Sequence, residues 1–106
     1  MRESGLQRFV IQEIRRRGWY AVTTCPPVES GTPDVLACVA GRFVGIEVKT
    51  EEGKPSKLQS YRLKQIHQAG GTATIVRSRK QLRDLLSLLE SSKPSGDATV
   101  SLESET

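Results

Sequence analysis

The sequence predicts an α/β protein with one mixed central sheet flanked by helices. Three segments carry apolar residues at helical spacing, and four short runs are rich in β-branched residues. Gly, Pro and Ser residues separate these segments and mark turns or helix ends between them. At 106 residues the chain is long enough for one domain with one core. The predicted order is helix, three strands, helix, strand and helix.

The first helix is predicted from an apolar stripe and from the signals at its end. Leu6, Val10 and Ile14 share one helical face, and Gly18 follows three arginines that favour a helix C-terminus. An aromatic and β-branched run then predicts the first strand, in which we expect Trp19 and Tyr20 to fill the core. The expected helices span residues 3–17, 57–69 and 79–90, and the expected strands span residues 19–24, 35–39, 42–49 and 72–77.

The two middle strands are expected to form an antiparallel hairpin, because only Ala40 and Gly41 separate them. The second helix has Ser56 as its expected N-cap and should bury Leu58 and Tyr61, although Tyr61 could instead pack at a dimer interface. This helix connects the third and fourth strands. These two strands should therefore be parallel.

The body of the chain is basic, and its C-terminal end is not. Residues 1–90 carry 15 Lys or Arg against 9 Asp or Glu, which suits a polyanionic partner such as nucleic acid. Residues 91–106 are rich in Ser and acidic residues, and we expect a disordered tail there. No apolar run is long enough for a membrane span, and the first residues do not resemble a secretory signal. Two widely spaced cysteines, Cys25 and Cys38, favour a cytoplasmic protein with reduced thiols.

Charged side chains interrupt the apolar hairpin. Asp34 precedes its first strand, and Glu47 and Lys49 share one face of its second strand. Such a pair is costly unless it is solvated, paired or bound to a metal. Asp34, Glu47 and the backbone carbonyl of Val48 could supply the oxygen ligands that Mg²⁺ prefers, and Lys49 could orient or help deprotonate an attacking water. The alternative is a Glu47–Lys49 ion pair on a solvated strand, with Asp34 as an ordinary turn residue.

The same residues carry a resemblance to a known family. Other features agree with it: an acid early in the first helix, a Gln past the lysine, and a Gly-Gly pair before the last strand. The family's typical Val-Arg-Arg at the end of that strand is reduced here to Val76-Arg77-Ser78. The central motif is Gly31-Thr32-Pro33-Asp34, followed thirteen residues later by Glu47-Val48-Lys49. It resembles the PD-(D/E)xK nuclease superfamily and, more narrowly, the VRR-NUC (virus-type replication-repair nuclease) domain.

The resemblance covers residues 3–90 and implies a restriction-endonuclease-like αβββαβα core. It also implies hydrolysis of DNA phosphodiesters with Mg²⁺ or Mn²⁺. By this resemblance Asp34 and Glu47 would bind the metal and Lys49 would be the catalytic lysine. Gln59 would support the site from the second helix, and Glu3 would hold a water or a second metal from the opposite side.

Basic residues in several places are candidate contacts to the DNA backbone. Two flank the start of the second helix, one ends the strand beside the catalytic one, and three end the first helix. For the last three, a solvated helix end is an equally good interpretation. The candidates are Lys54, Lys57, Arg77, Arg15, Arg16 and Arg17.

The sequence thus predicts a metal-dependent, structure-selective DNA endonuclease. A domain this small has little surface for reading base sequence, so DNA shape is the expected determinant. A four-way junction needs two symmetric cuts, and a C2 homodimer supplies two sites. The specific expectation is therefore a homodimeric Holliday-junction resolvase that acts on branched DNA in a bacterial cell, whether its gene is bacterial or phage-encoded. The alternatives are a monomeric flap or nicking nuclease and a non-catalytic DNA-binding module with the same fold.

Overall fold

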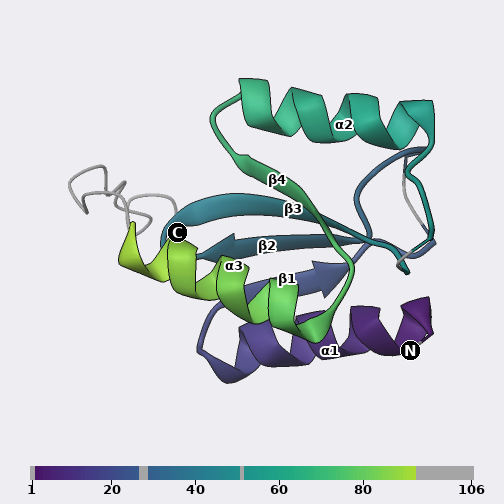
Figure 1. Cartoon of the computed structure of the whole chain (residues 1–106). Coiled ribbons are helices and arrows are strands. Elements are labelled where there is room, and N and C mark those ends of the chain that lie inside the picture. Colours follow the sequence, from purple (N-terminus) through teal and green to yellow (C-terminus); the bar gives the residue numbers. More distant parts are fainter. Residues whose placement is uncertain (1, 27–28, 51, 93–106) are drawn as a thin grey trace, which may run out of the picture.

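The computed structural model describes residues 2–26, 29–50 and 52–92 (Figure 1). Its helices and strands follow the predicted order, and their bounds lie within one residue of the predicted ones. The predicted tail lies almost entirely outside the described residues. No helix among the described residues is long and apolar enough to cross a membrane. The elements are α1 (Glu3–Arg16), β1 (Tyr20–Thr23), β2 (Val35–Val39), β3 (Arg42–Val48), α2 (Lys57–Gln68), β4 (Thr72–Val76) and α3 (Arg79–Ser91).

The four strands form one mixed sheet in the order β1-β2-β3-β4. β2 pairs antiparallel with both β1 and β3, whereas β3 and β4 are parallel and are connected through α2. The β2–β3 turn contains Ala40 and Gly41, whose φ angles are 50° and 85°. Positive φ at both central residues is what a tight two-residue hairpin turn requires. The predicted hairpin and the predicted parallel pair are both confirmed.

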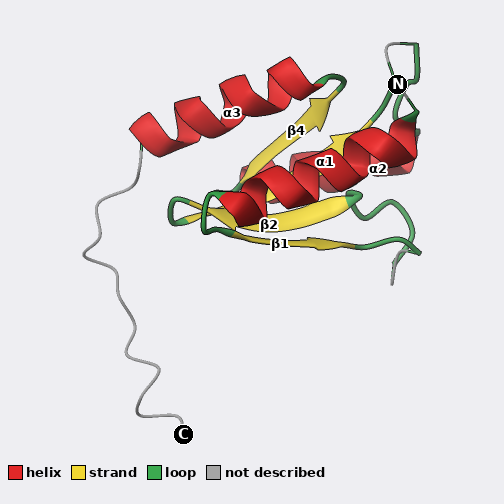
Figure 2. Cartoon of the chain, turned by 90° about the horizontal axis from the view of Figure 1, so that it is seen from below, coloured by secondary structure: helices red, strands yellow, loops and turns green. Residues whose placement is uncertain are grey.

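Helices lie on both faces of the sheet. α1 and α3 pack on one face and α2 lies on the other, as Figure 1 shows; Figure 2 shows the same elements after a turn of 90°. The α2 side of the sheet is less completely buried than the other side, because α2 contributes no fully buried residue. The core therefore lies on the α1/α3 side, where alternate residues of the strands meet one stripe of each helix. Its most buried members are Val10, Ile14, Val35, Val39, Val44, Ile46, Val48, Leu82 and Leu86.

α2 approaches the sheet closely at Ile66. A Cβ atom on Gly45 would lie 2.6 Å from Ile66 Cδ1, and one on Gly71 would lie 2.9 Å from Ile66 Cγ2. Glycine at these two positions therefore allows α2 to pack closely against the sheet at Ile66. The start of α2 is fixed by a capping box in which Ser56 and Gln59 each accept a hydrogen bond from the backbone N–H of the other. The predicted N-cap is confirmed.

Three apolar residues that were expected to be buried are exposed. Tyr20 is 64% exposed, Tyr61 is 55% exposed and Leu58 is 40% exposed. The prediction for Tyr20 was wrong because β1 is an edge strand and Ala21, not Tyr20, points to the core. The prediction that Leu58 and Tyr61 are buried was wrong because α2 packs on the sheet through only a small contact area. Trp19 is partly buried and packs against the core.

Candidate active site

The beginning of β2 and the end of β3 bring Asp34 and Glu47 together. The antiparallel register places them opposite each other, and the backbone N–H of Asp34 donates to Glu47 Oε1 at 3.2 Å. In return, the backbone N–H of Val48 donates to Asp34 Oδ2 at 2.9 Å. The Thr24 hydroxyl donates to the carbonyl of Pro33 and so ties the residue before Asp34 to the neighbouring strand. Two carboxylates from different strands are thus held in fixed contact.

Glu47 is a buried acid with an incomplete set of partners. Its side chain is 1% exposed, and Lys49 Nζ lies 3.6 Å from Oε2. Among the described residues, that buried Oε2 atom has no hydrogen-bond donor. Burial and the negative charge of Asp34 raise the pKa of Glu47 to about 7, against the opposing effect of Lys49. When both carboxyls are ionised the site therefore keeps a net negative charge, because the one positive charge of Lys49 balances only one of them.

The backbone carbonyl of Val48 faces the same place. In an extended strand the N–H and C=O of one residue point toward the same neighbouring strand, and the N–H of Val48 points to Asp34. Continuing the β2–β3 register puts Pro33 opposite Val48, and proline has no N–H to donate. The Val48 carbonyl consequently receives no ladder hydrogen bond from Pro33 and is a third oxygen donor beside the two carboxylates.

This donor set fits a hard divalent cation. The buried Oε2 of Glu47 needs a partner, and the two carboxylates repel each other unless a cation lies near them. Within the described residues no cluster of three or more His, Cys, Asp or Glu side chains could enclose a metal. Mg²⁺ is typically held by only one or two protein carboxylates, with water and substrate phosphate as further ligands. Asp34, Glu47 and the Val48 carbonyl are the residues that would hold it.

The loop between β3 and α2 forms a wall beside Lys49, whose side chain is 16% exposed. A Cβ atom on Gly53 would lie 3.5 Å from Lys49 Cδ, so the loop backbone packs against the lysine stem. Arg77 holds this loop, because its guanidinium donates to the carbonyls of Thr50 (2.8 Å) and Gly53 (2.6 Å). The structure thus gives Arg77 a role as a loop anchor, and its predicted DNA contact stays a prediction.

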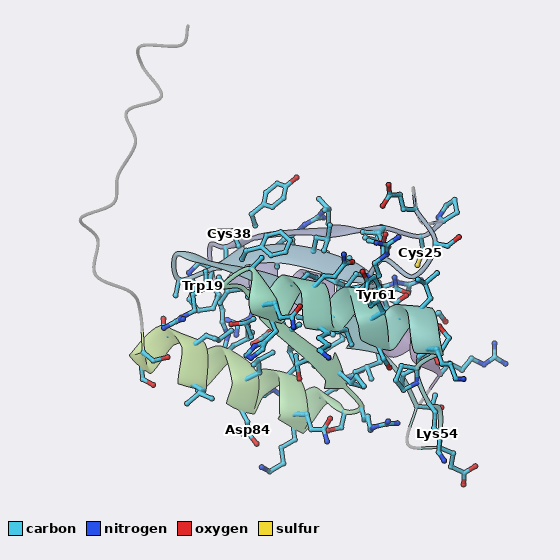
Figure 3. All side chains as sticks on the ribbon, turned by 90° about the horizontal axis from the view of Figure 1, so that it is seen from above. Trp19, Cys25, Cys38, Lys54, Tyr61 and Asp84 are labelled. Atoms are coloured by element: carbon cyan, nitrogen blue, oxygen red, sulfur yellow. The ribbon has the colours of Figure 1, made fainter. Side chains whose placement is uncertain are left out.

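Gln59, Lys54 and Lys57 lie around the start of α2. Gln59 Oε1 accepts the backbone N–H of Ser56 at 2.8 Å, so this side chain fixes the helix start. No hydrogen bond joins Gln59 to either carboxylate within the part of the chain described. Lys54 and Lys57 are exposed on the adjoining loop and first turn, where Figure 3 shows Lys54 pointing away from the body. Both lysines are accessible to a DNA backbone.

Two residues near the carboxylates were missed at the level of sequence. The thiol of Cys25 lies 3.6 Å from Asp34 Oδ1, and the side-chain amide of Gln7 donates to Cys25 Sγ and to the Thr23 hydroxyl. Gln7 follows Glu3 by one helical turn, so the two side chains share one face of α1, and that spacing could have pointed to Gln7 from the sequence. Glu3 is exposed on the same face of α1 and makes no hydrogen bond to the carboxylates among the described residues.

The three arginines at the end of α1 lie away from this site. Arg16 is nine residues beyond Gln7, or about 13 Å further along the helix. Arg16 and Arg17 both pair with Glu13, at 2.7 Å and 3.1 Å, and Arg15 donates to the Ala21 carbonyl. The structure therefore uses these side chains to close the helix end. It does not bring them to Asp34 and Glu47.

Solved structures share this fold. No family model matches the sequence, and no curated protein matches it. A structure described as "VRR_NUC domain" superposes with a TM-score of 0.68 at 25% identity, covering 80% of this chain and 94% of its own. Another, described as "VRR_NUC domain protein", gives a TM-score of 0.65 at 17% identity, covering 86% of this chain and 87% of its own. The chain has the VRR-NUC domain fold.

The VRR-NUC fold is that of a nuclease-type domain, and the predicted αβββαβα core is confirmed. The match extends over nearly the full length of both solved structures. In this chain Glu47 lies on β3, Asp34 immediately precedes β2, and the loop that leads to α2 packs against Lys49. The fold thus accounts for why Asp34, Glu47 and Lys49 meet although they are distributed over two strands.

Proposed function

We propose that this VRR-NUC domain is a Mg²⁺- or Mn²⁺-dependent DNA endonuclease. The observation that carries the proposal is the fixed contact of Asp34 with buried Glu47, beside Lys49. A purely structural ion pair would not require a second carboxylate that raises the pKa of Glu47. A binding module would gain nothing from two acids that repel phosphate. A phosphodiester hydrolase uses both acids and the lysine.

In the proposed reaction the two carboxylates and Lys49 have different roles. The bound metal would supply Lewis-acid stabilisation of charge at the phosphate. Asp34, Glu47 and the Val48 carbonyl hold the ion, and the hydrogen bonds between them keep their oxygens in place before substrate arrives. Lys49 brings a positive charge to the same point, where it can orient the attacking water and offset negative charge that develops at the phosphate.

We propose branched DNA as the substrate, and a Holliday junction in particular. The basic body of the domain suits a polyanion, and its small surface offers little for reading base sequence. Lys54 and Lys57 stand exposed on the loop and first helical turn that follow Lys49, and they are the proposed contacts to the DNA backbone. Two symmetric cuts across a junction require two sites, which a homodimer would provide.

A single substrate panel tests this proposal. Labelled four-way junction, flap, fork and linear duplex are incubated with the protein in Mg²⁺, in Mn²⁺ and in chelator, and the products are separated on a denaturing gel. We expect metal-dependent cleavage with the junction cut fastest. Glu47→Ala should abolish cleavage, whereas the matched control Glu90→Ala, which removes an exposed acid on α3, should not.

The other outcomes are equally informative. Faster cleavage of the flap, or nicking of the linear duplex, by a monomer would replace the resolvase proposal with a flap or nicking nuclease. Binding of the junction without cleavage in any metal would contradict the enzyme and favour a non-catalytic DNA-binding module. Cleavage by Glu47→Ala at the rate of the unchanged protein would contradict the assignment of the site.

A further inference from the structure

A row of exposed side chains crosses the sheet on its α2 side. In the strand register Tyr20 of β1 pairs with Cys38 of β2, and Cys38 pairs with Phe43 of β3. The residues that alternate with them, such as Ala21 and Val44, are buried on the opposite face. Tyr20 is 64% exposed, Phe43 is 50% exposed and Cys38 is also exposed. Two aromatic side chains and a thiol thus lie side by side and are exposed to solvent.

α2 borders this row without covering it. The helix packs on β3 and β4, and a groove runs between Phe43 and its C-terminal half, lined by Gln65, Ile66, Ala69 and Gly71. Tyr61, which is 55% exposed, stands on the same side of α2 as Gln65 and receives a hydrogen bond from its amide at 3.4 Å. Figure 3 looks down on α2 and shows Cys38 on the strands beside the helix that carries Tyr61.

The row is uncharged although the domain is basic. Tyr20, Cys38 and Phe43, and the next row with Val22 and Leu36, carry no charge. Aromatic platforms for single-stranded DNA lie in positively charged grooves, so this face is poorly matched to nucleic acid. Arg62 borders this side of the sheet, where its guanidinium lies 5.9 Å from the Tyr61 ring, and it is paired with Glu29 at 3.8 Å. Two copies of a face with an uncharged centre can, by contrast, meet there without electrostatic repulsion, even when each copy has a net charge of +4.

The exposed area suits the centre of a dimer interface. An aromatic side chain can bury about 150–250 Å², so Tyr20, Phe43 and Tyr61 together still expose roughly 300–400 Å². A stable interface buries about 800 Å² on each partner. The three aromatics alone would provide nearly half of that area as an apolar centre, and aromatic residues are the ones that dominate binding energy at such centres.

We infer that this face, defined as Tyr20, Cys38, Phe43 and Tyr61, binds the same face of a second copy of the chain about a two-fold axis. The inference names the interface for the homodimer of the proposed function and rests on it. The face lies toward the β2–β3 turn, whereas Asp34 and Glu47 lie at the other end of the same strands. Cys38 lies four residue steps along the strand from Asp34, or about 13 Å. Dimerisation would leave both pairs of carboxylates open to DNA.

The oligomeric state of the full chain tests the interface. Sedimentation velocity over a range of concentrations should show a dimer for the unchanged protein. Tyr20→Lys and Phe43→Lys should each raise the dimer dissociation constant at least about 30-fold, because each introduces a charge twice into one symmetric interface. Both side chains are half or more exposed, so the fold, followed by circular dichroism, should persist. Leu88→Lys is the matched control, because Leu88 on α3 is 64% exposed and should not affect the dimer.

The two cysteines provide a second readout without any substitution. Cys25 and Cys38 are both exposed in the single chain. Maleimide labelling followed by mass mapping should show Cys38 protected as protein concentration rises, with Cys25 reacting at a constant rate. Tyr20→Lys should restore the labelling of Cys38 at high concentration.

The outcomes separate the interface from the nuclease proposal. A monomer at all concentrations, or a dimer that both lysine variants leave intact while Cys38 stays reactive, would overturn the interface. Protection of Cys38 only after DNA is added would also overturn it and would make this face a nucleic-acid contact. Each of these results could coexist with metal-dependent cleavage. Loss of cleavage in Glu47→Ala with the dimer retained would, conversely, show that the two proposals stand on different residues.

Discussion

Replacing Glu47 by Gln should stabilise the metal-free protein above neutral pH. The folded-state pKa of Glu47 is about 7, against an ordinary value of 4.5. Below pH 4.5 the carboxyl is protonated in the folded and the unfolded chain, and folding carries no penalty. As pH rises from 4.5 to 7 the unfolded chain releases this proton first, so the free energy of unfolding falls. Above pH 7 the full penalty is present.

The size of the penalty follows from the difference between the two pKa values. A difference from 4.5 to about 7 corresponds to about 3 kcal/mol. Glu47 lies close to the part-exposed Lys49 and to solvent, so screening reduces this penalty to about 1–2 kcal/mol. Glu47→Gln keeps the shape and the acceptor for the Asp34 N–H while removing the charge. We expect the variant to melt roughly 5–15 °C higher than the unchanged protein at pH 8 in chelator, and at about the same temperature at pH 4.

Thermal unfolding followed by circular dichroism at pH 4 and pH 8 is the assay. Glu13→Gln is the control with the opposite sign, because the hydrogen bond from Arg16 lowers the pKa of Glu13 to about 2. That group contributes stability above pH 4.5 and loses it as pH falls toward 2, so its replacement should destabilise at pH 8 by about 1 kcal/mol. A Glu47→Gln variant that melts at or below the unchanged protein at pH 8 would refute the view of Glu47 as a strained acid.

Three further substitutions test the elements that support the site. Gly31→Ala should lower the free energy of unfolding by about 1–3 kcal/mol in urea titrations, because Gly31 has a φ of 82° and its new Cβ would lie 2.6 Å from Leu58 Cγ. Ser56→Ala should lower it by about 1 kcal/mol through loss of the α2 cap, and an unchanged urea midpoint would contradict the capping role. Arg77→Ala removes the hydrogen bonds to the Thr50 and Gly53 carbonyls. It should therefore increase amide hydrogen exchange in the loop at residues 50 and 52–56 while leaving the global free energy of unfolding nearly unchanged. Equal exchange in the variant and the unchanged protein would show that the loop needs no anchor.

The sequence predicted the order and bounds of the elements because the local signals agree with the tertiary structure. Ser56 caps the predicted helix, Ala40 and Gly41 turn the predicted hairpin, and Asp34 comes opposite Glu47 as the hairpin requires. The spacing within a hairpin is fixed by strand geometry, so contacts across it can be predicted from sequence position.

Contacts that depend on how separate elements pack were not predicted. Nothing local distinguishes Tyr20 in a buried strand from Tyr20 on an uncovered edge, because hydrophobicity alone does not say which face a helix will cover. The hydrogen bonds of Arg77 to the Thr50 and Gly53 carbonyls were not predicted, because these carbonyls lie more than twenty residues earlier in the chain. The predicted DNA contact of Arg77 stays a prediction. The burial of Glu47 was also hidden, because an ion pair with Lys49 on a solvated strand would have the same sequence pattern.

Single-turnover cleavage of a labelled four-way junction by Lys49→Ala tests whether Lys49 acts in the chemical step of DNA cleavage. Enzyme in excess over junction separates chemistry from binding, which a gel shift in chelator measures independently. Lys80→Ala is the matched control, because Lys80 pairs with Asp84 on the exposed surface of α3. We predict that Lys80→Ala cuts like the unchanged protein in Mg²⁺, and that Lys49→Ala binds the junction normally but cuts at least about 100-fold more slowly. Cleavage by Lys49→Ala at the unchanged rate would contradict this prediction.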